Sequence, residues 1–174
     1  MTIEIKRRRD LPKLITTDEP IGIELGVARG NYSKDIINRY NFKKFYMIDW
    51  WKNSNHVQSY LKLIEFTTAI KKQNEGTQIC VLRGAFSEFV NFFEDNYFDF
   101  IYVDGIADNG QLEGQTIRDW LPKVKPNGII CGHDYCNDYP KTKHYVNLVG
   151  EENNFNVNVV CLNDNHPSWY YTKK

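Results

Sequence analysis

The chain has 174 residues, of which 41% are hydrophobic and 25% are charged, as expected of one soluble globular domain with its own core. Its 22 basic and 22 acidic residues give a formal net charge of +0, which excludes a global field that would attract nucleic acid or an anionic membrane. We find neither a signal peptide nor an apolar run long enough to cross a bilayer. We therefore expect a cytoplasmic protein with no nucleic-acid or membrane partner.

Residues 1–20 form a short N-terminal segment before the first expected strand. The segment contains the basic run Lys6–Arg9, which Asp10 and Pro12 soon end. Short charged runs are usually solvated, so we interpret this one as a solvated terminal segment and not as a clamp for a polyanion.

Short apolar runs alternate with helix-like segments over most of the chain. The expected strands span about 21–25, 42–50, 77–82, 98–103 and 129–131, and the expected helices span about 33–40, 56–74, 86–94 and 116–121. The loop "KPNG" leads into the fifth strand. This alternation predicts a parallel sheet covered by helices on both faces.

The end of the sequence changes character. Two strand-like runs, 156–162 and 169–172, are separated by a polar loop that contains Pro167. Such a short connection predicts an antiparallel hairpin, because a parallel crossover needs more residues. We find no linker or repeat and predict a single domain over residues 1–174.

Four cysteines are scattered along the chain, at Cys80, Cys131, Cys136 and Cys161, and none forms a CxxC pair. Three of them lie in or beside apolar strand-like runs. This placement predicts reduced, buried thiols in preference to disulfides or a zinc site.

Polar residues or glycine follow each of the five expected parallel strands. These are Glu24-Leu25-Gly26, Asp49-Trp50, Arg83-Gly84-Ala85, Asp104-Gly105 and Gly132-His133-Asp134-Tyr135. Any one of them is equally well explained by the preference of Asp and Gly for turns. Because ligands bind outside the carboxyl ends of the strands in an open parallel sheet, five in succession predict a ligand site.

The stretch "IELGVARGNYS", residues 23–33, has two glycines four residues apart. It lacks the third glycine of the dinucleotide fingerprint and does not match a phosphate-binding P-loop. Asp49 lies 23 residues beyond Gly26 at the end of the second strand, where a carboxylate suits two ribose hydroxyls. Together these features predict a nucleoside-carrying ligand without a diphosphate.

Five segments in order resemble the motifs of class I S-adenosyl-L-methionine-dependent methyltransferases. They are "IELGVARGNYS", "FYMIDW", "VLRGAFSE", "FDFIYVDG" and "WLPKVKPNGIICGHDY". The last two are most similar to a subfamily of small methyltransferases with a GHDY segment, related to sugar and macrolide O-methyltransferases. The resemblance runs from about residue 21 to the final residues. It implies an α/β fold with a Rossmann-like, seven-stranded, mostly parallel sheet that ends in a C-terminal antiparallel β-hairpin.

The resemblance also assigns the cofactor, S-adenosyl-L-methionine, to particular residues. Gly26 and Gly30 would admit its methionine portion beside Ala28, Glu24 would organise the turn, Asp49 would bind the ribose and Trp50 would pack on the adenine. The remaining cofactor residues would be Tyr32, Ser33, Gly84, Ala85, Phe86 and Asp104. Two of them have structural alternatives, namely Ser33 as a helix cap only and Phe86 as a core residue only.

A hydroxyl acceptor must lose a proton, either to a base or with the help of a divalent metal. Asp104 and Asp134 end adjacent strands and would share Mg²⁺ or Mn²⁺, as related O-methyltransferases do. His133 would be the base or a further ligand. Asp108 would replace an acid missing from the loop after Asp104, which is about three residues longer than in the subfamily and lacks its histidine. The alternative is that Asp104 only bonds the cofactor and His133 only caps a turn.

Other polar and aromatic residues receive structural interpretations. His56 and His144 are expected on the surface, and His166 in a turn before Pro167. Trp51 and Tyr60 are expected in the core, with the rim of an acceptor site as the alternative.

We therefore expect an O-methyltransferase that acts on a hydroxyl of a sugar or glycan. The short N-terminal segment implies an open acceptor site, suited to the end of a larger glycan or to completion by a second subunit of a homodimer. One alternative is a phenolic or other small-metabolite acceptor. The other is a non-catalytic nucleoside- or dinucleotide-binding module.

Overall fold

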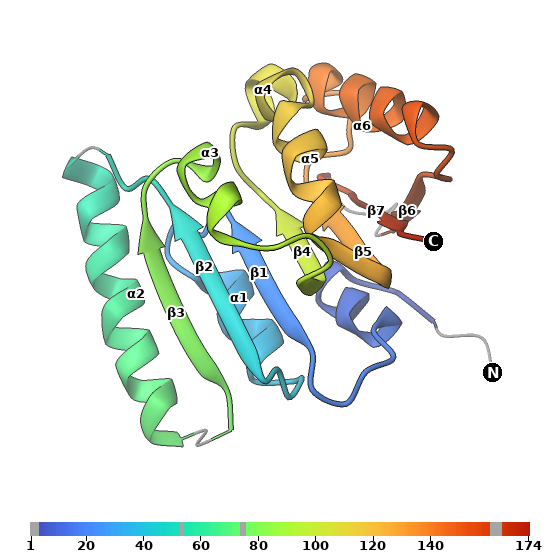
Figure 1. Ribbon diagram of the computed structural model, residues 1–174. Coiled ribbons are helices and arrows are strands. Elements are labelled where there is room, and N and C mark those ends of the chain that lie inside the picture. The colour runs from blue at the N-terminus through green and yellow to red at the C-terminus, as the bar shows by residue number, and fades with distance from the viewer. Residues whose placement is uncertain (1–3, 53, 74–75, 161–164) are drawn as a thin grey trace.

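Strands and helices alternate in the computed structural model (Figure 1), which describes residues 4–52, 54–73, 76–160 and 165–174. The side chains of residues 54–56, 66 and 69–73 are also outside the description. The strands are β1 (Ile21–Leu25), β2 (Lys44–Asp49), β3 (Gln78–Arg83), β4 (Phe98–Val103), β5 (Val124–Gly132), β6 (Asn158–Val160) and β7 (Ser168–Thr172). The α-helices are α1 (Asn31–Ile37), α2 (Ser54–Gln73), α3 (Phe86–Phe89), α4 (Gly110–Glu113), α5 (Gln115–Trp120) and α6 (Pro140–Glu152). The 3-10 helices are η1 (Arg8–Leu14), η2 (Val90–Phe92), η3 (Ala107–Asn109) and η4 (Leu121–Lys123).

The strands form one seven-stranded sheet in the order β3-β2-β1-β4-β5-β7-β6. The pairs among β1 to β5 are parallel, and β7 pairs antiparallel with both β5 and β6. The predicted α/β fold with a mostly parallel sheet and a C-terminal antiparallel hairpin is confirmed.

Two apolar cores cover the two faces of the sheet, because successive strand side chains point to opposite sides. Ile23 and Leu25 face one core, with Trp120 of α5 and Val146 of α6. The other core contains Phe45 and Met47 of β2, Ile36 of α1, Leu63 of α2 and Leu11 of η1. Figure 1 shows α1 behind the sheet and α3 and α5 in front of it. The predicted helices on both faces are therefore confirmed.

Several element boundaries differ from those expected. Helix α1 begins at Asn31 and ends at Ile37, about two residues earlier than expected at its start and three at its end. The "KPNG" segment is part of β5 and not a loop. It forms an irregular stretch of that strand, where the ladder with β4 shifts register and Asn127 adopts a positive φ of 64°. The sequence analysis gave no bounds for α6. Residue 74 and residues 161–162, expected at the ends of a helix and a strand, lie outside the described residues.

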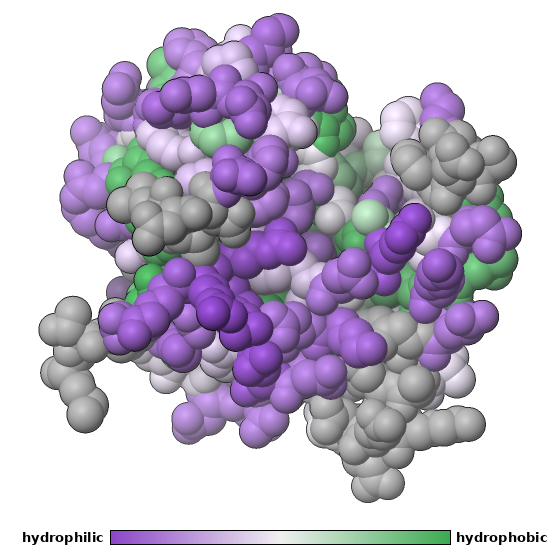
Figure 2. Space-filling view, turned by 180° about the vertical axis from the view of Figure 1, so that it is seen from behind, coloured by the Kyte–Doolittle hydropathy of each residue, from purple (hydrophilic) through white to green (hydrophobic). Residues whose placement is uncertain are grey.

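The N-terminal segment is packed against the sheet beyond its basic run, in which Lys6 and Arg7 are exposed as expected while Arg8 and Arg9 are half-buried. Leu11 is fully buried and Pro12 is buried, on the face that α1 also covers. The charged residues around them remain at the surface, and Figure 2 shows this face as mostly hydrophilic. Arg8 is only partly exposed, because its side chain turns inward to the carboxyl edge of the sheet.

The thiols of Cys80, Cys131 and Cys136 are free, as expected, while Cys161 lies outside the described residues. In the part of the chain that the structure describes, every helix is too short or too polar to cross a membrane.

The carboxyl ends of β1 and β4 approach each other at Gly26. Its φ is +95°, and a Cβ built on it would lie 2.3 Å from the carbonyl oxygen of Asp104. Both the backbone conformation and the missing side chain are therefore required at this position.

We expect Gly26→Ala to destabilise the fold by at least about 2 kcal/mol, because the left-handed backbone and the clash with the β4 backbone both oppose the new methyl group. For a chain of this size, this corresponds to a fall in Tm of roughly 4–8 °C. Urea and thermal unfolding measure it. Gly76→Ala is the matched control, because a Cβ there meets nothing within 4 Å, and equal stabilities of the two variants would contradict the prediction.

Candidate active site

A cavity of about 600 Å³ opens at the carboxyl edge of the parallel strands. Eight of the residues predicted from the sequence to bind the cofactor line it: Gly26, Ala28, Asp49, Trp50, Gly84, Ala85, Phe86 and Asp104. The rest of its wall is formed by Lys52, Ser87, Gly105, Ile106 and Leu112. Its volume lies within the range of pockets that hold small molecules.

A second cavity of about 420 Å³ adjoins the first and shares Gly26, Ala28 and Asp104 with it. The predicted residues Glu24 and Tyr32 line this second cavity, together with Arg8, Val27, Arg29, Asn31 and Ser59. Two further predicted residues line neither cavity. Gly30 is the N-cap of α1 with a φ of 74°, and Ser33 is fully buried beneath the turn.

A buried carboxyl group holds the glycine turn to α1. Glu24 is 1% exposed, and its Oε2 accepts a hydrogen bond from the Ser33 hydroxyl. Burial raises the pKa of Glu24 well above its usual range, although the bond from Ser33 opposes the shift. The alternative of Ser33 as a helix cap is wrong, since Gly30 is the N-cap of α1; the Ser33 hydroxyl instead satisfies a carboxyl group that the sheet has removed from water.

The Asp49 carboxylate holds the same turn from the side. Its Oδ2 accepts hydrogen bonds from the backbone N–H groups of Val27 at 2.9 Å and Ala28 at 2.7 Å. Its Oδ1 accepts from the Trp51 N–H at 3.3 Å. Asp49 therefore connects the end of β2 to the turn that follows β1.

The two adjacent tryptophans have opposite environments. Trp50 is 52% exposed and lines the larger cavity, whereas Trp51 is 1% exposed. The Trp51 indole N–H donates to the carbonyl oxygen of Ala28 at 2.9 Å. The backbone of Trp51 has a φ of 41°, which turns its side chain inward. The structure thus places Trp51 in the core, as expected, and excludes the alternative of an acceptor rim.

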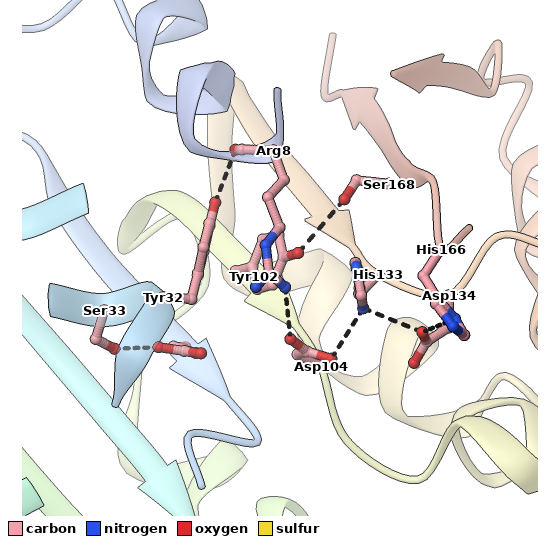
Figure 3. Close-up of polar contacts among 10 residues, drawn as sticks. Arg8, Tyr32, Ser33, Tyr102, Asp104, His133, Asp134, His166 and Ser168 are labelled. Atoms are coloured by element: carbon pink, nitrogen blue, oxygen red, sulfur yellow. Dashed lines mark hydrogen bonds and ion pairs between the residues drawn. The ribbon is translucent and has the colours of Figure 1, made fainter. Parts of the chain in front are cut away.

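Asp104, His133 and Asp134 meet beside the larger cavity (Figure 3). His133 Nδ1 lies 3.0 Å from Asp134 Oδ1 and 3.7 Å from Asp104 Oδ1. One ligand atom from each of the three lies within 4.8 Å of the others, close enough for a shared metal ion. β4 and β5 pair in parallel and deliver these side chains to one place.

His166 lies in a bend before Pro167, as expected, and it also joins this cluster. Its Nδ1 lies 3.1 Å from Asp134 Oδ1, the same oxygen that His133 approaches. The loop before β7 brings it there, because β7 pairs directly with β5. The sequence signal was a histidine just before the second strand of the expected hairpin.

Arg8 is the second residue that the sequence analysis missed. Its Nη1 lies 3.5 Å from Asp104 Oδ2, and its guanidinium carbon lies 5.2 Å from the centre of the Tyr32 ring. The Tyr32 hydroxyl donates to the Arg8 carbonyl oxygen at 3.1 Å. Asp104 therefore has a cationic partner on one side and an imidazole on the other (Figure 3).

The two carboxylates of the cluster have opposite pKa shifts. Burial raises the pKa of Asp104 to about 6, although His133 and Arg8 both oppose this rise. Burial also acts to raise the pKa of Asp134, but the hydrogen bond from His133 and the charges of both histidines lower it on balance. Asp104 is thus the carboxyl group of the cluster that titrates nearer to neutral pH.

The loop after Asp104 forms a left-handed turn. Residues 110–114 all have φ between 54° and 79°, three of them non-glycine, and Leu112 reaches the wall of the larger cavity. Asp108 is exposed in η3 and is not part of the metal-compatible group found among the described residues. The suggestion that it replaces a missing acid therefore has no support in this geometry.

The sequence model of a protein family described as "Methyltransferase domain" matches residues 23–135. The match begins in β1 and includes every member of the cluster except His166. A search of curated protein sequences gives no match.

Solved structures share the fold at low sequence identity. A precorrin-6y C5,15-methyltransferase from Geobacter metallireducens is 15% identical, with a TM-score of 0.70 over 94% of this chain and 85% of that one. An rRNA methylase from Streptococcus thermophilus is 16% identical, with a TM-score of 0.70 over 98% of both chains. A candidate caffeoyl-CoA O-methyltransferase from Staphylococcus aureus is 15% identical, with a TM-score of 0.69 over 98% of this chain and 86% of that one.

The raised pKa of Asp104 predicts a pH-dependent stability. Because its folded pKa of about 6 exceeds the ordinary value of 3.8, the carboxyl group stabilises the fold fully below about pH 4, and this contribution is lost as the pH rises through about 6. We expect the free energy of unfolding of Asp104→Asn to increase by about 2 kcal/mol relative to that of the natural chain as the pH rises from 4 to 7.5. Urea unfolding across this range measures the difference.

Asp95→Asn serves as the control, because this carboxylate pairs with Lys123 at the surface. Parallel stability profiles for Asp104→Asn and the natural chain would show that Asp104 keeps an ordinary pKa.

Proposed function

The chain belongs to the family of methyltransferase domains, and on that premise we propose that it transfers a methyl group from S-adenosyl-L-methionine to a hydroxyl of a sugar or glycan. The observation that carries the proposal is the double role of Asp104. This residue lines the larger cavity and also lies 3.7 Å from His133 Nδ1. A methyl donor in the cavity and a base for the acceptor would meet at this side chain.

We assign the nucleoside of the cofactor to the larger cavity. Trp50 and Phe86 offer aromatic surface there for the adenine. Asp49 Oδ1 has one long backbone contact, at 3.3 Å, so this oxygen retains capacity to accept a hydrogen bond from a ribose hydroxyl. These contacts support the role of Asp49 that the sequence resemblance implied.

The reaction forms a bond from the acceptor oxygen to the methyl carbon and breaks the bond from that carbon to sulfur, leaving S-adenosylhomocysteine. Because the sulfonium is a good leaving group, alignment of donor and acceptor supplies much of the rate. The acceptor proton then needs a base. Both carboxylates approach Nδ1 of His133, which favours the proton on that nitrogen and leaves Nε2 to accept the acceptor's proton.

A divalent cation is the second route for removing that proton. Asp104, His133 and Asp134 fit such an ion by their mutual distances, and Mg²⁺ or Mn²⁺ bound there would lower the pKa of the acceptor hydroxyl. We favour His133 acting alone, because the Arg8 guanidinium already provides positive charge beside Asp104.

A third cavity supports a sugar as the acceptor. It has a volume of about 350 Å³ and is lined by Tyr135, Cys136, Asn137, Asp138, Lys143, Asn165 and Pro167. It adjoins the cluster, since Tyr135 follows Asp134 and Pro167 follows His166 in the chain. The ammonium group of Lys143 can donate to sugar hydroxyls, the carboxylate of Asp138 can accept from them and the asparagine amides can do both, while Tyr135 adds an aromatic surface.

Two alternatives remain from the sequence. A phenolic or other small-metabolite acceptor keeps the same cofactor and base, but it makes less use of the polar groups in the third cavity. A non-catalytic nucleoside-binding module would have no use for the Asp104–His133–Asp134 cluster.

We expect isothermal titration calorimetry to show binding of S-adenosylhomocysteine and no binding of NAD. The reason is that the turn after β1 lacks the third glycine that approaches a pyrophosphate. Tight NAD binding, or the absence of binding by either ligand, would contradict the proposed function.

We expect His133→Ala to lower kcat by roughly 10²- to 10⁴-fold, the usual contribution of a general base, while the Kd for S-adenosylhomocysteine is unchanged. Methyl transfer is measured on the best acceptor from a panel of monosaccharides, glycans and phenols. His144→Ala is the control, since this histidine is exposed on α6.

The same assay tests the route and the acceptor. EDTA is expected to leave turnover unchanged. Loss of turnover in EDTA that Mg²⁺ or Mn²⁺ restores would favour the metal route, and activity confined to phenols would replace the sugar with the first alternative.

A further inference from the structure

We propose that Arg8 binds the carboxylate of the methionine portion of S-adenosyl-L-methionine, so that the N-terminal segment completes the cofactor site. The inference rests on the cofactor named above. Arg8 lies outside the matched residues 23–135, so the family match assigns it no role.

The shapes of the two cavities place the methionine portion beside Arg8. The larger cavity holds the nucleoside in our assignment, and the smaller one continues from it past Gly26, Ala28 and Asp104. A ligand that extends from the first cavity into the second passes Gly26, which lines both. Its amino-acid end then lies in the cavity that Arg8 lines.

Arg8 is held in place by contacts along its whole length. Its carbonyl oxygen accepts a hydrogen bond from the Tyr32 hydroxyl at 3.1 Å, and its guanidinium lies over the ring of the same tyrosine. Three residues further on, Leu11 anchors η1 in the core. Arg29 also lines the cavity but is exposed, so Arg8 is the better positioned of the two cations.

The charges of the second cavity require a cation for an anionic ligand group. Asp104 lines it, and without a positive partner its carboxylate would repel an anionic group of the ligand. Arg8 makes one long contact of 3.5 Å to Asp104 and a side-chain hydrogen bond to Tyr102. Its guanidinium has five N–H groups in all and can bind a carboxylate through two of them. Asp104 in turn suits the ammonium group of the same amino-acid end.

Calorimetry with two ligands isolates this contact. S-adenosylhomocysteine carries the amino-acid end, whereas 5′-methylthioadenosine has the same nucleoside and lacks it. We expect Arg8→Ala to weaken S-adenosylhomocysteine binding roughly 10- to 100-fold, as expected for a charged hydrogen-bonded pair. Binding of 5′-methylthioadenosine should change less than about twofold, and Arg8→Lys should give an intermediate loss.

Arg7→Ala is the matched control, because Arg7 is the exposed neighbour and should leave both affinities unchanged. The inference is overturned if Arg8→Ala weakens both ligands equally, which indicates a structural role, or weakens neither. If the natural chain binds 5′-methylthioadenosine but not S-adenosylhomocysteine, it is also overturned. Binding of neither ligand contradicts the proposed function itself.

Trypsin provides an independent measurement, since Arg7, Arg8 and Arg9 are adjacent cleavage sites. We expect S-adenosylhomocysteine to slow cleavage at these arginines in the natural chain and 5′-methylthioadenosine to slow it much less. Equal protection by both ligands would show that the N-terminal segment does not respond to the amino-acid end.

Discussion

The backbone of β4 passes so close to Gly26 that no side chain fits between them, and the arrangement of the site follows from this contact. It brings the turn after β1 against Asp104, so one residue borders both cofactor-side cavities and the Asp104–His133–Asp134 cluster. Hydrogen bonds to Asp49 and the buried Glu24 then fix the turn from two sides. In the proposed assignment, the distance between the cofactor and His133 is therefore set by main-chain packing.

The cluster alternates acidic and basic groups, and Arg8 extends this pattern at the Asp104 end. Each carboxylate is shared between two groups that can carry positive charge. Partly buried carboxylates are tolerated when they are paired and hydrogen-bonded. The protonation states of these side chains consequently depend on one another, so removal of one side chain changes the protonation of its neighbours.

The sequence predicts best the features that depend on a single strand and the turn after it. Asp49, Asp104 and His133 each follow an apolar strand, so strand periodicity and turn chemistry were sufficient to place them at one edge. Arg8 and His166 were missed because they reach the site through tertiary packing of η1 and of the loop before β7, for which local sequence gives no direction. The burial of Trp51 was expected, but the positive φ that separates it from the exposed Trp50 was not, because local sequence does not reveal that φ.

The position of β7 between β5 and β6 has a consequence for the order of folding. β6 is an edge strand and, among the described residues, pairs with β7 alone, although it precedes β7 in the chain. It therefore joins the sheet only through residues 168–172, which pair with β5. Pairings between distant segments form slowly because loop closure must come first. The insertion of β7 also brings His166 to Asp134, so the site is completed at the same late step that closes the sheet.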